Sequence, residues 1–181
     1  MTRISSHLFF FLIMILSGIL LFDSCREIST EHKGNDKKGY KESLMKVNKN
    51  LVKTEEQKIE DFIHRYKWQM KKTGTGLRYM IYHEGNGVKT EKDNIVVISF
   101  TVSLLNGDVC YTSKEEGLNE FKIGKGGVVS GLEEGILLMK KGDRAKFIIP
   151  SHLAFGLLGD MNKIPAKAVL VYDVELLIIN Y

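Results

Sequence analysis

Phe121-Lys122-Ile123-Gly124 opens the most informative stretch of the sequence. It is followed by Val128-Val129-Ser130-Gly131-Leu132-Glu133-Glu134-Gly135, then by Ala154-Phe155-Gly156, Ile164-Pro165 and Leu170-Val171-Tyr172-Asp173-Val174-Glu175-Leu176. Apolar, strand-like segments and glycine turns alternate here, without a nucleophile motif, a metal cluster or a complete phosphate-binding loop. This pattern favours a shallow aromatic pocket whose chemistry depends on apolar surface and backbone N–H groups.

The segments around this stretch are predicted to be strands joined by tight turns. Alternation predicts a strand whose buried face is formed by Val96, Ile98, Phe100, Val102 and Leu104. Asn106-Gly107 then predicts a hairpin turn, because both residues tolerate positive φ. Ser130 is expected to cap a short helix that continues to Lys141 and ends at Gly142. Further strands are predicted near residues 77–81, 144–150 and 168–179.

An amphipathic helix is predicted ahead of the first strand. Thr54-Glu55-Glu56-Gln57 matches a capping box, and an apolar stripe follows at helical spacing: Ile59, Phe62, Ile63 and Tyr66. Gly74 is expected to end this helix. Its apolar face would pack on the domain or pair with a second copy of the chain. The predicted fold class is α+β, a twisted antiparallel half-barrel wrapped over a short helix, with an additional N-terminal helix.

From about Asp93 to the end of the chain, the order of these motifs closely resembles the FKBP-type peptidyl-prolyl cis-trans isomerases. The resemblance implies the half-barrel fold and catalysis of rotation about X–Pro bonds without a cofactor or a metal. The positions that correspond to catalytic residues are Phe100, Tyr111, Val129, Phe155 and Tyr172. The positions that correspond to substrate-binding residues are Cys110, Phe121, Val128, Leu132 and Ile164.

The resemblance also assigns a role to several of these positions. Phe100, Phe121 and Tyr172 would surround the proline ring, and Leu132 would form the floor where the family often has Trp. The Val129 N–H would donate a hydrogen bond to a substrate carbonyl. Ile164-Pro165 matches the loop that closes the rim of the pocket.

Two positions depart from the family pattern. Cys110-Tyr111 stands where the family usually has Phe-Asp, and Phe155 stands where it usually has Tyr. A carboxylate and a hydroxyl are therefore absent from these positions, and we expect reduced turnover. On this basis, Tyr111→Asp and Phe155→Tyr should each raise turnover. Strand alternation would turn Tyr111 away from the side of Cys110 unless a bulge rotates it inward.

The N-terminus has the layout of a secretory signal. Arg3 precedes an apolar run from Leu8 to Phe22, which ends at Ser24-Cys25. This resembles a bacterial lipoprotein cleavage site, at which Cys25 would be lipidated; an uncleaved N-terminal anchor is the alternative. The predicted organisation is a lipoprotein-type signal peptide at 1–24, a polar spacer at 25–53, the N-terminal helix and leading strand at 54–90, and an FKBP-like domain at 91–181. We expect the spacer to be mobile, apart from a marginal helix near residues 40–49.

Charge and residue usage exclude several other classes of function. The net charge of +4 is small and the lysines are scattered, so nucleic acid is not an expected partner. The five histidines lie far apart in sequence, which predicts no metal site. Cys110 would be an unpaired thiol and an apolar filler, since no basic neighbour in sequence would lower its pKa.

The leading hypothesis is an exported, membrane-tethered prolyl isomerase that assists the folding of exported proteins and acts on proline-containing polypeptides. One alternative is a binding module or chaperone with the same fold that grips such segments without useful catalysis. Another is an accessory of an envelope machine, because the chain is similar to the gliding motility-associated FKBP-like lipoproteins of Bacteroidota. Either reading of the N-terminus exports the domain and tethers it; with Cys25 lipidated, the chain is expected in the cell envelope, lipid-anchored on the periplasmic side or at the outer membrane.

Overall fold

The computed structural model describes residues 34–180, so the predicted signal peptide and Cys25 lie outside the described residues. Residues 46–181 form one compact unit, and the segment up to Met45 is a separate one.

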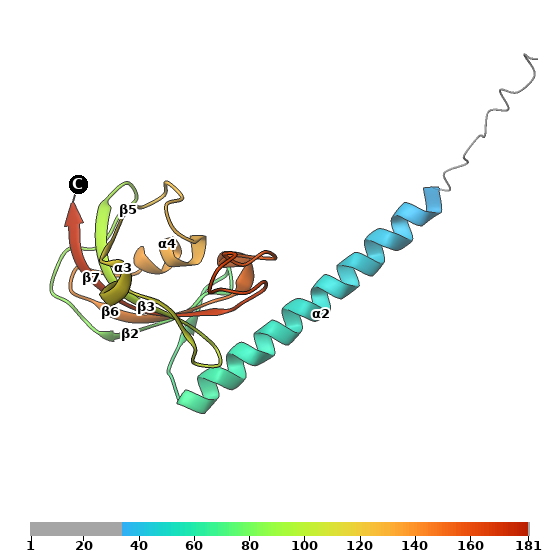
Figure 1. The fold of residues 1–181 in the computed structure, drawn as a ribbon, viewed down its shortest axis with the longest axis horizontal. Coiled ribbons are helices and arrows are strands. Elements are labelled where there is room, and N and C mark those ends of the chain that lie inside the picture. The colour runs from blue at the N-terminus through green and yellow to red at the C-terminus, as the bar shows by residue number, and fades with distance from the viewer. Residues whose placement is uncertain (1–33, 181) are drawn as a thin grey trace, which may run out of the picture. The chain divides into compact units, whose positions relative to one another are not determined.

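The compact unit is built on one antiparallel sheet. Its strands lie side by side in the order β1 (Lys71–Lys72), β2 (Arg78–His83), β6 (Arg144–Ile149), β7 (Leu170–Asn180), β3 (Ile95–Leu104) and β4 (Val109–Thr112). β5 (Asn119–Lys122) pairs with the other end of β3. The sheet curves around the short helix α4 (Ser130–Ile136), as Figure 1 shows. Two further short helices, α3 (Ser113–Glu116) and the 3-10 turn η1 (Ser151–Leu153), lie in the connections.

The main core lies between α4 and the concave face of the sheet. Leu132 and Ile136 of α4 are fully buried there, together with Phe147 of β6. On β7, alternation places Leu170, Tyr172, Val174 and Leu176 in this core, as the sequence predicts. The helix approaches the sheet closely because Gly135 carries no side chain: a Cβ at this position would lie 2.8 Å from Phe147 Cζ.

Gly135→Ala should therefore lower the free energy of unfolding by about 1–3 kcal/mol, since the buried Phe147 ring has no free space to move into. Chemical denaturation measures the change. Gly74→Ala is the matched control, because a Cβ there would meet no atom within 4 Å. Equal stability of the two variants would contradict this packing.

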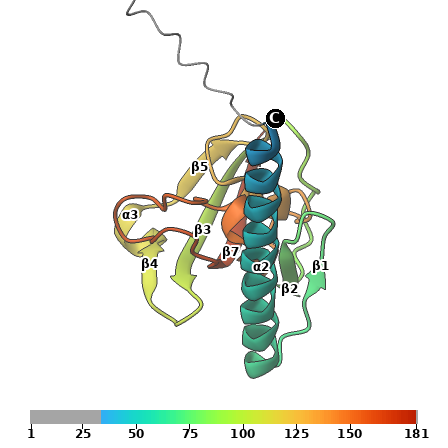
Figure 2. The ribbon, with the colours of Figure 1, turned by 90° about the vertical axis from the view of Figure 1, so that its right-hand side faces the viewer.

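The convex face of the sheet is covered by the C-terminal part of α2 (Gly34–Tyr66), as Figure 2 shows. Ile59 and Phe62 of this helix form a second, smaller core with Ile148 of β6 and Val169 and Val171 near the start of β7. The predicted helical stripe thus packs on the domain.

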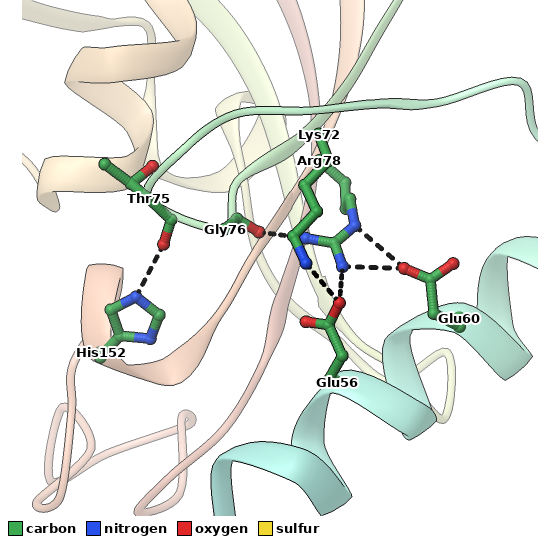
Figure 3. Close-up of polar contacts among 7 residues, drawn as sticks. All are labelled: Glu56, Glu60, Lys72, Thr75, Gly76, Arg78 and His152. Atoms are coloured by element: carbon green, nitrogen blue, oxygen red, sulfur yellow. Dashed lines mark hydrogen bonds and ion pairs between the residues drawn. The ribbon is translucent and has the colours of Figure 1, made fainter.

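A buried arginine fixes the same helix to β2. The Arg78 side chain is 2% exposed, and its Nη2 lies 2.5 Å from Glu56 Oε1 and 2.8 Å from Glu60 Oε1. Its Nη1 donates to the Gly76 carbonyl oxygen, and Lys72 Nζ lies 2.6 Å from Glu56 Oε1. Figure 3 shows both carboxylates directed from α2 towards the guanidinium. The hydrogen bond from Lys72 and the charge of Arg78 lower the pKa of Glu56.

Two predicted helix boundaries were wrong at the N-terminal helix. α2 begins at Gly34 rather than Thr54, so the described part of the predicted spacer is helical. The Thr54 hydroxyl does not cap a helix but bonds the Asn50 carbonyl oxygen one turn earlier. Lys- and Glu-rich segments have high helix propensity, which accounts for the longer helix. The helix ends at Tyr66, before Gly74, because Lys67 adopts a left-handed φ of 55° and Trp68 N donates to the Ile63 carbonyl oxygen.

The central helix is also shorter than predicted. α4 ends at Ile136 rather than Lys141, and Val129 occupies its N-cap position instead of Ser130. The Ser130 hydroxyl bonds the Leu153 carbonyl oxygen, and the residues after Ile136 form turns that lead to β6.

Candidate functional site

Two adjoining hollows lie at the open end of the half-barrel and form one cleft. Both are lined by Phe100 of β3, Asn119 of β5, Phe155 of the loop after η1 and Tyr172 of β7. The inner hollow has a volume of about 410 Å³ and the outer one about 540 Å³. Phe100 and Tyr172 lie on the same face of the sheet, since Phe100 pairs with Val174 and Val102 pairs with Tyr172.

The inner hollow is lined by apolar side chains and by backbone. Val128, Val129 and Leu132 line it at the start of α4, together with Gly126 and Gly127. Glu133 holds the preceding glycine loop in place, because its Oε1 accepts hydrogen bonds from the N–H groups of residues 124 and 126.

The backbone N–H of Val129 is a hydrogen-bond donor without an acceptor among residues 34–180. With φ −60° and ψ 142°, Val129 caps α4 through its carbonyl oxygen, which accepts hydrogen bonds from Leu132 N and Glu133 N. The N–H donor is therefore available to a ligand in the inner hollow.

The outer hollow has a more polar lining. It adds Tyr111 of β4, Ile164 and a group of polar residues: Glu116, Asp160 and Asn162. Tyr111 reaches this hollow because β4 contains a bulge. Val102 pairs with Tyr111 and Ser103 pairs with Val109, so Cys110 has no partner in the ladder. The bulge lets Cys110 and Tyr111 both face inwards, which simple alternation does not allow.

Asp160 is the residue of this site that sequence reasoning missed. Tyr111 Oη donates a hydrogen bond to its Oδ2, and the N–H groups of Asn162 and Ile164 donate to its Oδ1 at 2.9 and 2.8 Å. Burial raises the pKa of Asp160, but these three hydrogen bonds outweigh it and hold the pKa below its usual value. The cleft therefore contains a charged carboxylate at neutral pH, although Tyr111 occupies the position where the resemblance expects one.

Eight of the ten predicted site residues line the cleft, and two do not. Phe121 is 7% exposed and Cys110 is 3% exposed, and both belong to the core beneath the cleft. Phe121 packs under Gly127, whose Cβ position would lie 3.5 Å from Phe121 Cβ. Burial, and then Asp160, raise the pKa of the Cys110 thiol, so it stays protonated at neutral pH. Both residues support the lining rather than form it.

The polar groups of the cleft are carboxylates, amides and the Tyr111 and Tyr172 hydroxyls. Its lining contains no cysteine, serine, histidine or lysine. In the part of the chain that the structure describes, no three His, Cys, Asp or Glu side chains are grouped so as to hold a metal ion. The arrangement can enclose an apolar ring and orient a carbonyl group.

Comparison with known proteins agrees with this geometry. The family model described as FKBP-type peptidyl-prolyl cis-trans isomerase matches residues 87–177, half of the chain. The chain belongs to this family. The predicted FKBP-type fold and isomerase family are thereby confirmed, and the α+β half-barrel is supported by the structural neighbours.

Several relatives of this FKBP-type chain illustrate its range. It is 44% identical over 94 residues to FK506-binding protein 2 of Dictyostelium discoideum, covering 51% of this chain and 71% of the relative. It is 38% identical over 107 residues to a probable FKBP-type isomerase, FkpA, of Neisseria meningitidis, covering 59% of this chain and 39% of that protein. The chain thus spans about four tenths of the length of such FkpA relatives.

Two solved structures show the same fold. The crystal structure of FkpA from Escherichia coli has a TM-score of 0.63 at 24% identity, covering 99% of this chain and 75% of that one. The crystal structure of AtFKBP13 has a TM-score of 0.58 at 28% identity, covering 60% of this chain and 97% of that one. At 24% identity, the first of these supports the fold alone.

Proposed function

We propose that this chain is a peptidyl-prolyl cis-trans isomerase of reduced activity, attached to a membrane by a lipid, which assists the folding of exported proteins. The observation that carries the proposal is the juxtaposition of the aromatic cleft with the unused Val129 N–H. Phe100, Phe155 and Tyr172 line both hollows, and the N–H lies at the edge of the inner one.

The chemistry requires no covalent group. Rotation about an X–Pro bond crosses a barrier of roughly 20 kcal/mol, because the amide loses resonance as it twists. The twisted amide has less charge separation than the planar one, so a dry apolar cleft favours it. Phe100 and Tyr172 would contact the proline ring, Leu132 would form the floor, and Val129 N–H would fix the neighbouring carbonyl. Binding energy would then stabilise the twisted geometry.

The proposed rate is lower than that of a relative with the usual residues. Phe155 offers no hydroxyl to a substrate carbonyl, and the carboxylate bonded to Tyr111, Asp160, already accepts three hydrogen bonds. Each lost hydrogen bond corresponds to about 0.5–1.5 kcal/mol. Two such losses correspond to a rate about tenfold to a hundredfold lower. A prolyl isomerisation assay with the full chain tests this proposal.

A binding module or chaperone accessory is the second candidate, and one observation favours it. Leu157, Leu158 and Met161, in the loop beside the cleft, are 73%, 73% and 86% exposed. An exposed apolar rim of this kind suits the capture of unfolded polypeptide, with or without turnover. If the chain binds proline peptides or suppresses aggregation without accelerating isomerisation, this candidate replaces the first.

The proposed location is the cell envelope, with Cys25 as the lipid-bearing residue. The apolar run ending in Ser24-Cys25 supports this, as does the match to bacterial FkpA proteins. None of the helices in residues 34–180 combines the length and apolar character of a membrane-spanning helix. Proline-containing polypeptides are the proposed substrates, and an envelope machine is the partner proposed if the chain is an accessory of the kind that its sequence resembles.

The lipid anchor can be tested directly. Cells fed a radiolabelled fatty acid should label the wild-type chain, and Cys25→Ala should remove the label and release the protein from the membrane fraction, because two acyl chains are needed for stable attachment. Cys110→Ala is the matched control and should label like wild type, since Cys110 is buried. Equal labelling of wild type and Cys25→Ala would contradict the anchor.

A further inference from the structure

The loop that follows η1 carries much of the outer cleft. We call residues 154–169 the rim loop; it contributes Phe155, Asp160, Asn162 and Ile164 to the lining. Positive φ angles at four of its residues, 156, 159, 161 and 167, show that it is irregular. Its own backbone hydrogen bonds include Asp160 N to the Ile164 carbonyl oxygen and Lys167 N to the Gly156 carbonyl oxygen. These bonds shape the loop but do not fix it against the sheet.

The connection between the rim loop and β4 is made by side chains. Tyr111 Oη donates to Asp160 Oδ2, and Asn162 Nδ2 donates to Tyr111 Oη at 3.3 Å. Lys163 Nζ lies 4.9 Å from the centre of the Tyr111 ring and 3.9 Å from Glu115 Oε2. Tyr111 is thus bonded at its hydroxyl and covered on its ring by three residues of one loop, Asp160, Asn162 and Lys163.

Asp160 links this contact to the shape of the loop. One of its carboxylate oxygens accepts from Tyr111, while the other accepts from the N–H groups of Asn162 and Ile164. Ile164 is 2% exposed and lines the outer hollow. A single carboxylate therefore contacts both the turn of the loop and Tyr111 of β4, and Cys110 Sγ adds a second contact between β4 and the loop by donating to the Lys163 carbonyl oxygen at 3.7 Å.

We propose that Tyr111 and Asp160 are a pair of positioning residues that hold the rim loop closed over the outer cleft, and so place Phe155 and Ile164 against the substrate. This inference rests on the proposed isomerase function and assigns a purpose to the tyrosine that replaces the usual aspartate of the family. Tyr111 acts through Asp160 and the loop, not on the reacting bond.

The pair changes the expected effect of one substitution. On the residues alone, Tyr111→Asp should raise turnover by restoring a carboxylate. In the structure, the shorter aspartate side chain would not reach Asp160 as the Tyr111 hydroxyl does, so the contact with the rim loop would be lost, and a second negative charge would be added on the same side of the cleft. We therefore expect Tyr111→Asp to open the rim loop and lower kcat/KM.

The pH dependence follows from the lowered pKa of Asp160. A carboxyl whose folded pKa is depressed contributes stability above its unfolded pKa of about 3.9 and loses it as the pH falls through the folded value. The other titratable or charged groups near the pair are Cys110, whose pKa is raised by burial, Lys163 over the Tyr111 ring, Glu115 beside Lys163, and Glu116 in the same hollow. The loop contact should thus be constant from about pH 5 to pH 8 and fail only in strong acid.

Three variants of the full chain separate positioning from a direct effect of charge. Tyr111→Phe removes only the hydroxyl. Asp160→Asn keeps an oxygen for the two N–H groups and offers an amide donor to Tyr111, and Asp160→Ala removes every contact. Tyr82→Phe is the matched control, because the Tyr82 hydroxyl bonds Asp173 at 2.7 Å and does not line the cleft.

Two measurements are made on each variant, namely kcat and KM for a short X–Pro peptide and hydrogen exchange of the backbone amides in residues 156–164. For Tyr111→Phe we expect kcat/KM to fall about three- to tenfold, mostly through KM, with faster exchange in the loop. The kcat/KM of Asp160→Asn should stay within about twofold of the wild-type value. Asp160→Ala should show the largest fall in kcat/KM of the three variants. Melting temperatures of Tyr111→Phe and Tyr82→Phe should be similar.

Two results would overturn the inference. If Tyr111→Phe leaves loop exchange and kcat/KM as they are in Tyr82→Phe, the pair does not position the loop. If Asp160→Asn loses as much activity as Asp160→Ala while its loop exchange stays slow, the charge of Asp160 acts on the substrate directly. A wild-type chain without isomerase activity would instead refute the proposed function, and the exchange data would still decide whether the pair holds the loop.

Discussion

Replacing Tyr172 by alanine should abolish detectable isomerisation, a fall of about a hundredfold or more in kcat/KM. Tyr172 lines both hollows, and its ring packs between Val102 of β3 and Phe147 of β6, its partners in the ladder. Without the ring, a bound proline loses its aromatic contact on the side of the sheet and can shift by the width of a side chain. A misplacement of about 1 Å is enough for such a loss.

The same substitution should also destabilise the domain, by about 3–5 kcal/mol, because Tyr172 is 8% exposed and its removal leaves a cavity. Two further variants separate a lost wall from a lost fold. Tyr172→Leu keeps apolar volume, and should stay folded yet lose most of the activity. Tyr172→Phe keeps the ring, and should retain activity, since no described residue forms a hydrogen bond with the Tyr172 hydroxyl. Unchanged turnover in a folded Tyr172→Leu protein would show that the ring is not part of the site.

Removing both carboxylates that face Arg78 should destabilise the compact unit by about 3–5 kcal/mol, the cost of leaving a buried charge without partners. The guanidinium is 2% exposed in the wild type, and in the variant Glu56→Ala with Glu60→Ala it keeps only the Gly76 carbonyl oxygen as a partner. The C-terminal part of α2 should then separate from β2, which hydrogen exchange can detect alongside chemical denaturation.

Arg78→Met is the informative counterpart of that variant. The side chains of Glu56 and Glu60 are 39% and 51% exposed, so water can solvate them once the arginine is gone. Methionine fills a similar apolar volume, and the loss should be small, under about 1.5 kcal/mol. If Arg78→Met proves more damaging than the double glutamate variant, the buried charge is not what ties the helix to the sheet.

The four longer strands, β2, β3, β6 and β7, could be predicted from the sequence, because alternation reports burial directly. Leu170, Tyr172, Val174 and Leu176 do share the core face of β7, and Asn106-Gly107 does lie in the turn between β3 and β4. Helix limits could not be predicted as well. Thr54-Glu55-Glu56-Gln57 matches the sequence of a capping box, but the helix already begins at Gly34. Thr54 therefore lies inside the helix, where its hydroxyl bonds the Asn50 carbonyl oxygen.

The outer half of the cleft could not be predicted, for two physical reasons. The orientation of Tyr111 depends on a bulge, which adds one residue to β4 and reverses the face of those that follow. The partnership of Tyr111 with Asp160 spans 49 positions and depends on an irregular loop whose conformation no periodicity describes. Phe121 and Cys110 were expected at the surface of the cleft, and the structure places both in the core below it.

The central claim is that an aromatic cleft with the free Val129 N–H accelerates X–Pro isomerisation without an acid at position 111. A protease-coupled assay with the full chain and a short X–Pro peptide tests it most directly, compared with an FKBP relative that carries the usual Phe-Asp and Tyr. The account predicts a first-order rate that rises linearly with enzyme concentration above the uncatalysed reaction of tens of seconds. Its slope should be about tenfold to a hundredfold smaller than that of the relative. A folded wild-type chain that leaves the uncatalysed rate unchanged at every concentration would contradict the account.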